Sequence, residues 1–100
     1  MARHVIQQVV KYGHWKHFTT AHDALNRAGG AVGLPAYRLF ASQWGAMNEA
    51  FTEAEYEDAA SIERITGAAM QDPATLSAFR EMTNHLVDGS ARDYVLVEEK

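Results

Sequence analysis

Residues 37–57 read YRLFASQWGAMNEAFTEAEYE, and this stretch predicts a β-hairpin. Gly45-Ala46 can form a two-residue type II′ turn, because glycine readily adopts the positive φ that the first turn position needs. A turn of this length fixes the register of both strands. On one face it pairs Arg38 with Glu53, Phe40 with Phe51 and Ser42 with Glu49; on the other it pairs Tyr37 with Ala54, Leu39 with Thr52 and Ala41 with Ala50.

The two faces of this hairpin differ in chemistry. Ala41, Ala50 and Ala54 are small enough for helices to pack closely, so we expect helices to cover their face. The opposite face carries Arg38, Phe40, Ser42, Glu49, Phe51, Glu53 and Glu55, with Trp44 near the turn. A bare patch of phenylalanine is unusual in a monomer, and a second copy of the same sheet would cover it. We therefore expect a homodimer with a mixed polar and aromatic cleft that suits a small-molecule ligand.

The rest of the chain supplies two more strands and two helical regions. Residues 5–12 and 92–98 are rich in β-branched and aromatic side chains, which favours strands. Residues 14–29 carry an apolar stripe at helical spacing that includes Trp15. This first helix should stop at Gly29-Gly30, where a left-handed residue can close it.

A second helical region starts near Asp58, an acceptable helix cap, and runs to Gly89. Asp72-Pro73 interrupts it, because an Asp cap followed by Pro at the first helical position restarts a helix. The order βαββαβ predicts a ferredoxin-like α+β fold, a four-stranded antiparallel sheet with two helices on one face, in a single domain over residues 1–100. Two alternating sets in the first strand suit the covered face equally: Val5, Gln7 and Val9, or Ile6, Gln8 and Val10.

Composition is that of an ordinary globular protein. The 100 residues are 47% hydrophobic and 22% charged, and because a chain this short buries little surface, association with a partner would increase its stability.

A net charge of −4 argues against nucleic-acid binding, and no apolar run approaches the ~18 residues of a membrane-spanning helix. The first residues lack a signal-peptide core, so we expect a cytoplasmic protein. With no cysteine, disulfides and thiolate chemistry are excluded.

Four segments together span nearly the whole chain and resemble one superfamily. They are Val10-Lys11-Tyr12-Gly13-His14-Trp15, Leu34-Pro35-Ala36-Tyr37-Arg38 with Trp44-Gly45, Glu53-Ala54-Glu55-Tyr56-Glu57-Asp58, and Gln71-Asp72-Pro73 through Phe79. The chain resembles the dimeric α/β-barrel superfamily, and within it the small NIPSNAP-like and antibiotic-biosynthesis-monooxygenase-like proteins. This resemblance implies a homodimer with ligand clefts. Members include cofactor-independent monooxygenases, haem-degrading enzymes, muconolactone-type isomerases, polyketide cyclases and proteins of no known activity.

The chain lacks most of the functional residues of the haem-degrading branch. That branch uses an Asn on the first strand with a Trp and a His in the second helical region. This chain has Gln7 and Gln8 on the first strand, and only His85 falls in the matching element. The resemblance therefore does not extend to haem chemistry, and we expect no cofactor.

Polar groups on the open face of the hairpin supply candidate chemistry. Glu49 and Glu53 are the candidate catalytic bases, because a carboxylate in a cleft can accept a proton from a ligand. Arg38 can hold a carboxylate or enolate oxygen of that ligand. The alternative is that Arg38 and the glutamates form only a cross-strand ion pair, which sets the register of the sheet at a hydrated dimer interface. The other candidate substrate-binding residues are Phe40, Ser42, Trp44 and Phe51, whose rings can stack on a planar ligand.

The histidines raise the possibility of a metal site. His14 and His17 are i,i+3 neighbours on the predicted helix, but no third ligand falls at a convincing spacing, so we expect no metal. We expect a partly buried polar position for His22 and a structural role for His85 near a helix C-terminus. His4, at the start of the first strand, can line a cleft or lie on the surface.

Two functional hypotheses from different classes follow. In the first, a homodimer binds a small aromatic or apolar molecule in a cleft between the sheet and the helices or the partner sheet, and transforms it as a cofactor-independent monooxygenase, isomerase or cyclase. In the second, the dimer is a non-catalytic ligand carrier or interaction module. The sequence identifies no substrate and leaves both open.

Overall fold

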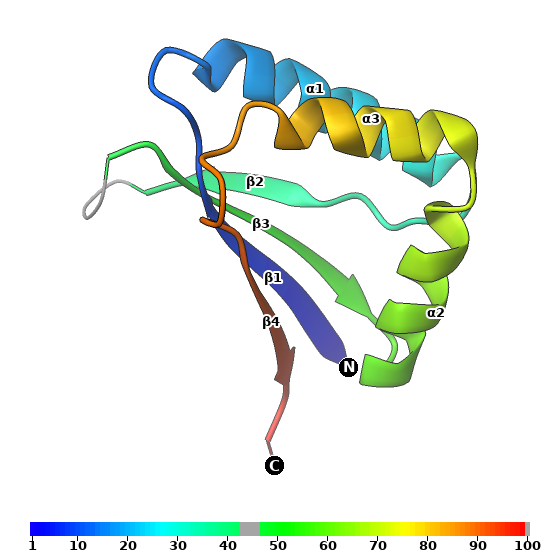
Figure 1. The fold of residues 1–100 in the computed structure, drawn as a ribbon. Coiled ribbons are helices and arrows are strands. Elements are labelled where there is room, and N and C mark those ends of the chain that lie inside the picture. Colours follow the sequence, from blue (N-terminus) through cyan, green and yellow to red (C-terminus); the bar gives the residue numbers. More distant parts are fainter. Residues whose placement is uncertain (43–46, 100) are drawn as a thin grey trace.

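The computed structural model describes residues 1–42 and 47–99, and within them a four-stranded antiparallel sheet carries three helices on one face (Figure 1). The strands lie in the order β2-β3-β1-β4. This is the predicted ferredoxin-like arrangement, with the second helical region divided into two helices. The elements are β1 (Ala2–Val9), α1 (Trp15–Gly30), β2 (Arg38–Ala41), β3 (Glu49–Tyr56), α2 (Ala59–Ala69), α3 (Pro73–Thr83) and β4 (Arg92–Val97).

The register of the β2–β3 hairpin is the one predicted. The observed partners are Arg38 with Glu53, Leu39 with Thr52, Phe40 with Phe51, and Ala41 with Ala50. The ladder continues one step further, because the Ser42 amide donates to the Glu49 carbonyl oxygen at 3.1 Å. The proposed Gly45-Ala46 turn lies outside the described residues.

Burial confirms the predicted faces of the sheet. Ala50, Thr52 and Ala54 are buried under the helices, whereas Phe40 keeps 40% of its surface exposed on the other side. The side of the sheet away from the helices is called the open face below. For β1 the choice that the sequence left open is settled, because Gln8 is buried on the helix side. The even-numbered residues of β1 therefore face the helices, and the odd-numbered ones lie on the open face.

The first strand and first helix differ slightly from expectation at their ends. β1 stops at Val9, and Val10 forms an isolated bridge to Leu86. Trp15 was expected on the buried stripe of α1, but it is the first residue of the helix and remains 36% exposed, with its ring 5.9 Å from that of Phe18. A side chain in the first turn has no preceding turn of its own helix to shelter it.

The end of α1 falls at Gly30 as expected, but for a different reason. The residue after the helix, Ala31, is right-handed, and the left-handed position comes later, at Gly33 with φ 96°. Gly29 is required by packing, since a Cβ there would lie 2.5 Å from Leu34 Cδ2. Gly29 thus lets the chain fold back tightly against the helix that it leaves.

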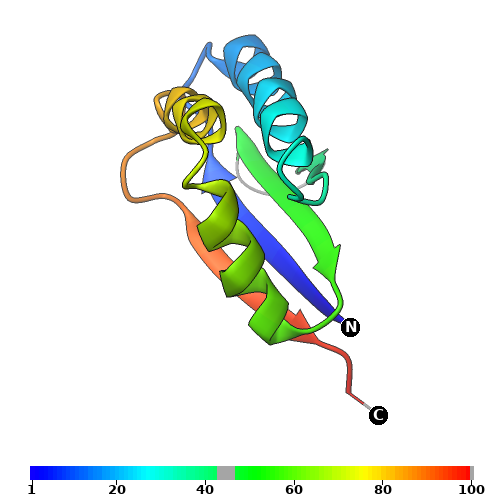
Figure 2. The same cartoon turned by 90° about the vertical axis from the view of Figure 1, so that its right-hand side faces the viewer.

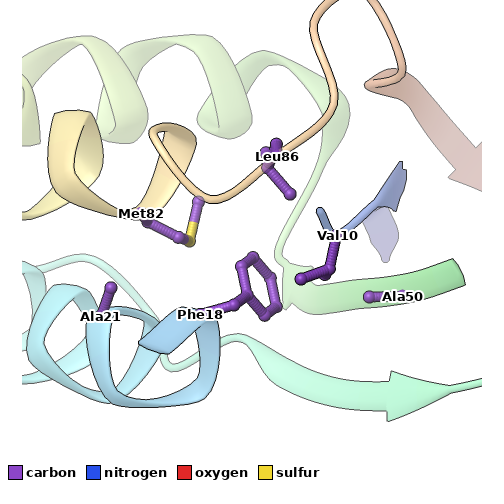
Figure 3. Packing of buried hydrophobic residues seen from close by; sticks show 6 residues of the cluster. All are labelled: Val10, Phe18, Ala21, Ala50, Met82 and Leu86. Atoms are coloured by element: carbon purple, nitrogen blue, oxygen red, sulfur yellow. The ribbon is translucent and has the colours of Figure 1, made fainter. Parts of the chain in front are cut away.

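One hydrophobic cluster joins α1 and α3 to the sheet (Figure 3). The Phe18 ring is fully buried, and Figure 3 shows it between Val10 after β1, Met82 of α3 and Leu86 after α3. Figure 2, turned by 90°, shows α2 in front of the sheet, with α1 and α3 near the top of the view. The cluster consists of Val10, Phe18, Ala21, Ala50, Met82 and Leu86.

Both predicted helix caps are present. Asp58 accepts a hydrogen bond from the Ser61 amide at the start of α2, and Asp72 accepts one from the Thr75 amide at the start of α3. Accepting hydrogen bonds from Ser61 lowers the pKa of Asp58. Pro73 occupies the first turn of α3, where its missing N–H is not needed.

Replacing Asp72 by alanine should lower the free energy of unfolding by about 1 kcal/mol, because the buried Thr75 loses the acceptor for both its amide and its hydroxyl. Urea unfolding followed by circular dichroism measures the change. Asp88→Ala, at an exposed position outside the helices, is the matched control. Equal stabilities for the two variants would contradict the capping role.

Candidate functional site

A cavity of about 290 Å³ lies between the sheet and the helices. Every strand except β2 contributes to its lining, as do all three helices and the loops between them. Its size is near the lower end of the range found for small-molecule sites. The lining residues are His4, Ile6, Gln8, His22, Leu25, Leu34, Tyr37, Thr52, Thr66, Met70, Phe79, Met82, Thr83, Leu86, Ala91 and Asp93.

Most of the cavity wall is apolar. Leu25 from α1, Phe79 and Met82 from α3, Met70 after α2 and Leu34 before β2 supply this surface. Such a wall removes an apolar ligand from water, which favours binding by roughly 25 cal/mol per Å² of buried apolar surface. The wall can therefore hold the body of a ligand but gives it little orientation.

A chain of polar side chains supplies orientation at one place in this cavity. His4 Nδ1 lies 2.7 Å from the Tyr37 hydroxyl, and His4 Nε2 lies 2.9 Å from Asp93 Oδ1. The Tyr37 hydroxyl is also 2.6 Å from the Tyr56 hydroxyl. The four residues, called the His4 network below, come from β1, the segment before β2, β3 and β4.

Two side chains of α1 hold Tyr37 in place by binding its main chain. The Asn26 side-chain amide pairs with the main chain of Tyr37 twice, accepting from the Tyr37 amide and donating to its carbonyl oxygen, both at 2.9 Å. His22 Nε2 lies 2.9 Å from the same carbonyl oxygen. Tyr37 precedes the first ladder residue of β2, so these contacts substitute for strand pairing and aim its ring at His4.

The chemistry of Asp93 sets the direction of the hydrogen bonds. A carboxylate can only accept, so His4 Nε2 carries the proton of that contact. With neutral His4, Nδ1 is then an acceptor, and the Tyr37 hydroxyl donates to it. The Tyr37 oxygen in turn accepts from the Tyr56 hydroxyl. The hydrogen bonds therefore run in one direction: the Tyr56 hydroxyl donates to Tyr37, and the Tyr37 hydroxyl donates to His4.

Both tyrosines of the network hold their protons more tightly than free tyrosine. Burial raises the pKa of Tyr37 far above its ordinary value of 10.0, and the charges of Tyr56 and Asp93 raise it further. Burial also raises the pKa of Tyr56. At neutral pH both side chains are hydrogen-bonding phenols and not phenolates.

These pKa shifts predict an alkaline limit to stability. A raised pKa in the folded state stabilises the fold fully below pH 10 and loses that contribution as the pH rises further. In an absorbance titration at 295 nm, Tyr37 should ionise well above pH 10, and the ionisation of Tyr56 should also be displaced above pH 10. The Tyr37→Phe/Tyr56→Phe double variant should lose this late phase. A single transition near pH 10 in the folded wild type would contradict the buried network.

The site residues predicted from the sequence lie on the open face, away from this cavity. Arg38 faces Glu53 across the ladder and lies over the Phe40 ring at 5.1 Å. Glu49 accepts from the Gln7 side-chain amide, and Ser42 follows β2 at the end of the ladder. Phe51 lies between Glu49 and Glu53 on the same face of β3, and Trp44 lies outside the described residues. The structure therefore brings Arg38, Phe40, Phe51 and Glu53 together, and their catalytic and binding roles stay predictions.

The histidines form two separate groups. Nδ1 of His14 lies 3.1 Å from Nδ1 of His85, whose Nε2 contacts Glu81 at 3.1 Å, and the His17 ring stacks on His85. Across residues 1–42 and 47–99, no group of three or more His, Asp or Glu side chains has the geometry to hold a metal ion. His22 is buried on the inner stripe, where it contacts the Tyr37 carbonyl oxygen.

Sequence reasoning left most of the His4 network unassigned. His4 was expected to line a cleft or lie on the surface, and the structure places it in the cavity. Tyr37 was expected on the helix-covered face, which is where it lies, but its partners come from distant strands. The available signal was Asp93 near the start of the last strand, an acidic residue that follows Arg92 and precedes an apolar and aromatic run.

Comparison with solved structures places this fold among known ones. A NIPSNAP family protein of unknown function from Agrobacterium tumefaciens superposes with a TM-score of 0.79 at 15% identity, over 96% of this chain and 86% of that one. A NIPSNAP domain protein from Burkholderia xenovorans gives a TM-score of 0.80 at 14% identity, over 99% and 95% of the two chains. A putative antibiotic biosynthesis monooxygenase from Nitrosomonas europaea gives 0.72 at 9% identity, over 98% of each. The chain has the ferredoxin-like fold that these proteins share.

Sequence comparison adds no assignment. No protein-family model matches the chain, and no curated protein matches it. Among the described residues, the helices are all too short or too polar to cross a membrane. The superpositions establish a common fold, and identities of 9–15% carry no information on activity.

Proposed function

We propose that the protein is a homodimer that binds a small, largely apolar molecule in the cavity between the sheet and helices of each protomer. One observation carries this proposal: the apolar wall of the cavity meets the ordered hydrogen bonds of the His4 network. A pocket with an apolar wall and a few convergent polar groups is the common form of a small-molecule site. The wall contributes affinity, and the network contributes orientation.

The open face supports the homodimer. Phe40 is 40% exposed there, and Tyr94 and Leu96 of β4, whose partners in β1 are odd-numbered, are 43% and 53% exposed. An apolar surface of this kind is what sheet-to-sheet packing would bury. One structural neighbour is described as an antibiotic biosynthesis monooxygenase and another as a putative one. Monooxygenation, isomerisation or cyclisation of the bound molecule are the reaction classes proposed.

Ligand binding is tested by native mass spectrometry of the purified protein, with release and identification of bound molecules. We expect a dimer of twice 11.1 kDa, or 22.2 kDa, that carries a releasable molecule. Thr66→Phe in α2 fills part of the cavity and should abolish this binding, whereas Ala68→Phe, exposed on the same helix, should preserve it. Binding that survives Thr66→Phe would place the ligand elsewhere.

The residues predicted on the open face define a second candidate, a cleft between the two sheets of the dimer. Its supporting observation is the grouping of Arg38, Phe40, Phe51 and Glu53 on that face. Once a released ligand provides an assay, Glu49→Gln and Glu53→Gln test it. A catalytic base should lose turnover with the fold intact, whereas a residue that only sets register should lose stability or dimerisation. Full activity in both variants would remove these two glutamates as bases and leave a carrier function as the alternative on this face.

A further inference from the structure

We infer that His4 accepts a proton from the bound molecule by way of the Tyr37 hydroxyl, so that the ligand carries a weakly acidic hydroxyl group, a phenol or an enol. The inference rests on the proposed function, since it concerns the molecule that occupies the cavity. The arrangement that carries it is the line Asp93, His4, Tyr37 along the cavity wall.

The first step of the argument concerns what Tyr37 can offer a ligand. Its one proton is donated to His4 Nδ1, and one of its acceptor positions is filled by Tyr56. A phenol oxygen has a further lone pair but no second proton. Tyr37 therefore presents an acceptor to the cavity, and a ligand group that meets it must be a donor such as O–H.

The second step concerns where the ligand proton can go. As the ligand O–H bond breaks, its proton forms a new O–H bond to Tyr37, and the original Tyr37 proton moves to His4 Nδ1. The ligand keeps the electron pair and becomes an oxyanion hydrogen-bonded to Tyr37. His4 becomes an imidazolium with both nitrogens protonated, and no oxidant or further reactant is consumed.

The third step concerns why the cation is tolerated at His4. The His4 side chain is only 14% exposed, so a charge there needs a partner. Asp93 Oδ1 stands 2.9 Å from Nε2 and is that partner, although the 66% exposure of its side chain weakens the attraction. His22, the other titratable ring that lines the cavity, is directed at the Tyr37 carbonyl oxygen.

Tyr37 is suited to pass protons because it stays neutral at both ends of the transfer. Its raised pKa means that a lasting phenolate does not form at this position. Tyr37 thus touches the ligand, His4 holds the proton, and Asp93 is a positioning residue that fixes the tautomer of His4. Tyr56 completes the line by donating to the Tyr37 oxygen.

The test uses two probes of nearly equal shape on the full chain. 4-Nitrophenol reports its own ionisation by the absorbance of its anion, and 4-nitroanisole has no hydroxyl proton. Both should bind the cavity and compete with each other. Bound nitrophenol should ionise about one pH unit below free nitrophenol, a tenfold shift in its equilibrium constant. Its anion band in the bound state is the readout.

Variants separate the roles of the three residues. His4→Gln and Tyr37→Phe should remove the shift in the ionisation of nitrophenol while nitroanisole still binds. Asp93→Asn should reduce the change in the ionisation constant about threefold or more, because an amide stabilises the His4 imidazolium less well than a carboxylate does. Asp88→Asn, an exposed acid outside the cavity, is the control and should leave the shift unchanged.

The two possible failures are distinct. If neither probe binds, the proposed ligand-binding function is overturned and the inference falls with it. If nitroanisole binds and nitrophenol binds without a lowered ionisation, or if His4→Gln keeps the full shift, the cavity stands and the proton transfer is overturned.

Discussion

Replacing Phe18 by alanine is expected to lower the free energy of unfolding by about 3–5 kcal/mol. The ring is fully buried, and it packs where α1, the end of β1 and the segment after α3 meet. Figure 3 shows the ring among the side chains of Val10, Met82 and Leu86, which belong to the same buried cluster. Truncation would lose the transfer free energy of the ring and leave a void that the surrounding backbone cannot fully close.

A loss of this size is large for a domain of this length, whose total stability is typically about 5–15 kcal/mol. Urea unfolding at fixed protein concentration measures it, because any dimer makes stability depend on concentration. Tyr12→Ala is the control, since that side chain is 86% exposed and should matter little. A Phe18→Ala loss below about 1 kcal/mol would mean that the cluster is not the core of the fold.

Replacing Phe51 by glutamate is expected to separate the proposed homodimer into monomers. Phe51 lies opposite Phe40 in the open face and between Glu49 and Glu53 on β3. The substitution would remove an apolar anchor and place a third carboxylate beside two others. Because a symmetric interface contains each residue twice, the loss would be counted twice. With about 2 kcal/mol or more for each of the two buried aromatic anchors, the total loss is about 4 kcal/mol or more, and the dimer should weaken by about a thousandfold.

Native mass spectrometry or light scattering over a range of concentrations would show the change from 22.2 to 11.1 kDa. Phe51→Leu keeps an apolar side chain and should keep most of the association, while Glu63→Gln on the exposed surface of α2 should change nothing. A wild type that is monomeric would refute the homodimer. A Phe51→Glu variant that stays dimeric would move the interface to another surface.

Features that depend on neighbours in sequence were predictable. The register of the β2–β3 hairpin, the Asp58 and Asp72 caps and the face that Ala50 presents to the helices all follow from local spacing and side-chain size. These features rest on a single hairpin or a single helix turn, where the physical rules act over a few residues.

The His4 network was beyond such reasoning, because its members meet only in the folded sheet. His4 and Asp93 stand 89 positions apart, and neither set of β1 residues could be preferred for the helix side from its hydrophobicity alone. Gln8 illustrates the difficulty, since a polar residue is fully buried there and hydrogen-bonded to Thr52. The position of Tyr37 likewise depends on Asn26 of α1, a contact that no strand pattern indicates.

The order of the strands also determines when the sheet can be completed during synthesis. β1 is made early but lies between β3 and β4, and β4 is the last of the four strands to leave the ribosome. Until then one edge of β1 stays unpaired, a state in which a nascent chain is prone to mistaken pairing. Asp93 arrives with β4, so His4 acquires its carboxylate partner at the same moment that the sheet closes. The pairing of β4 with β1 therefore completes the sheet and the His4–Asp93 contact together.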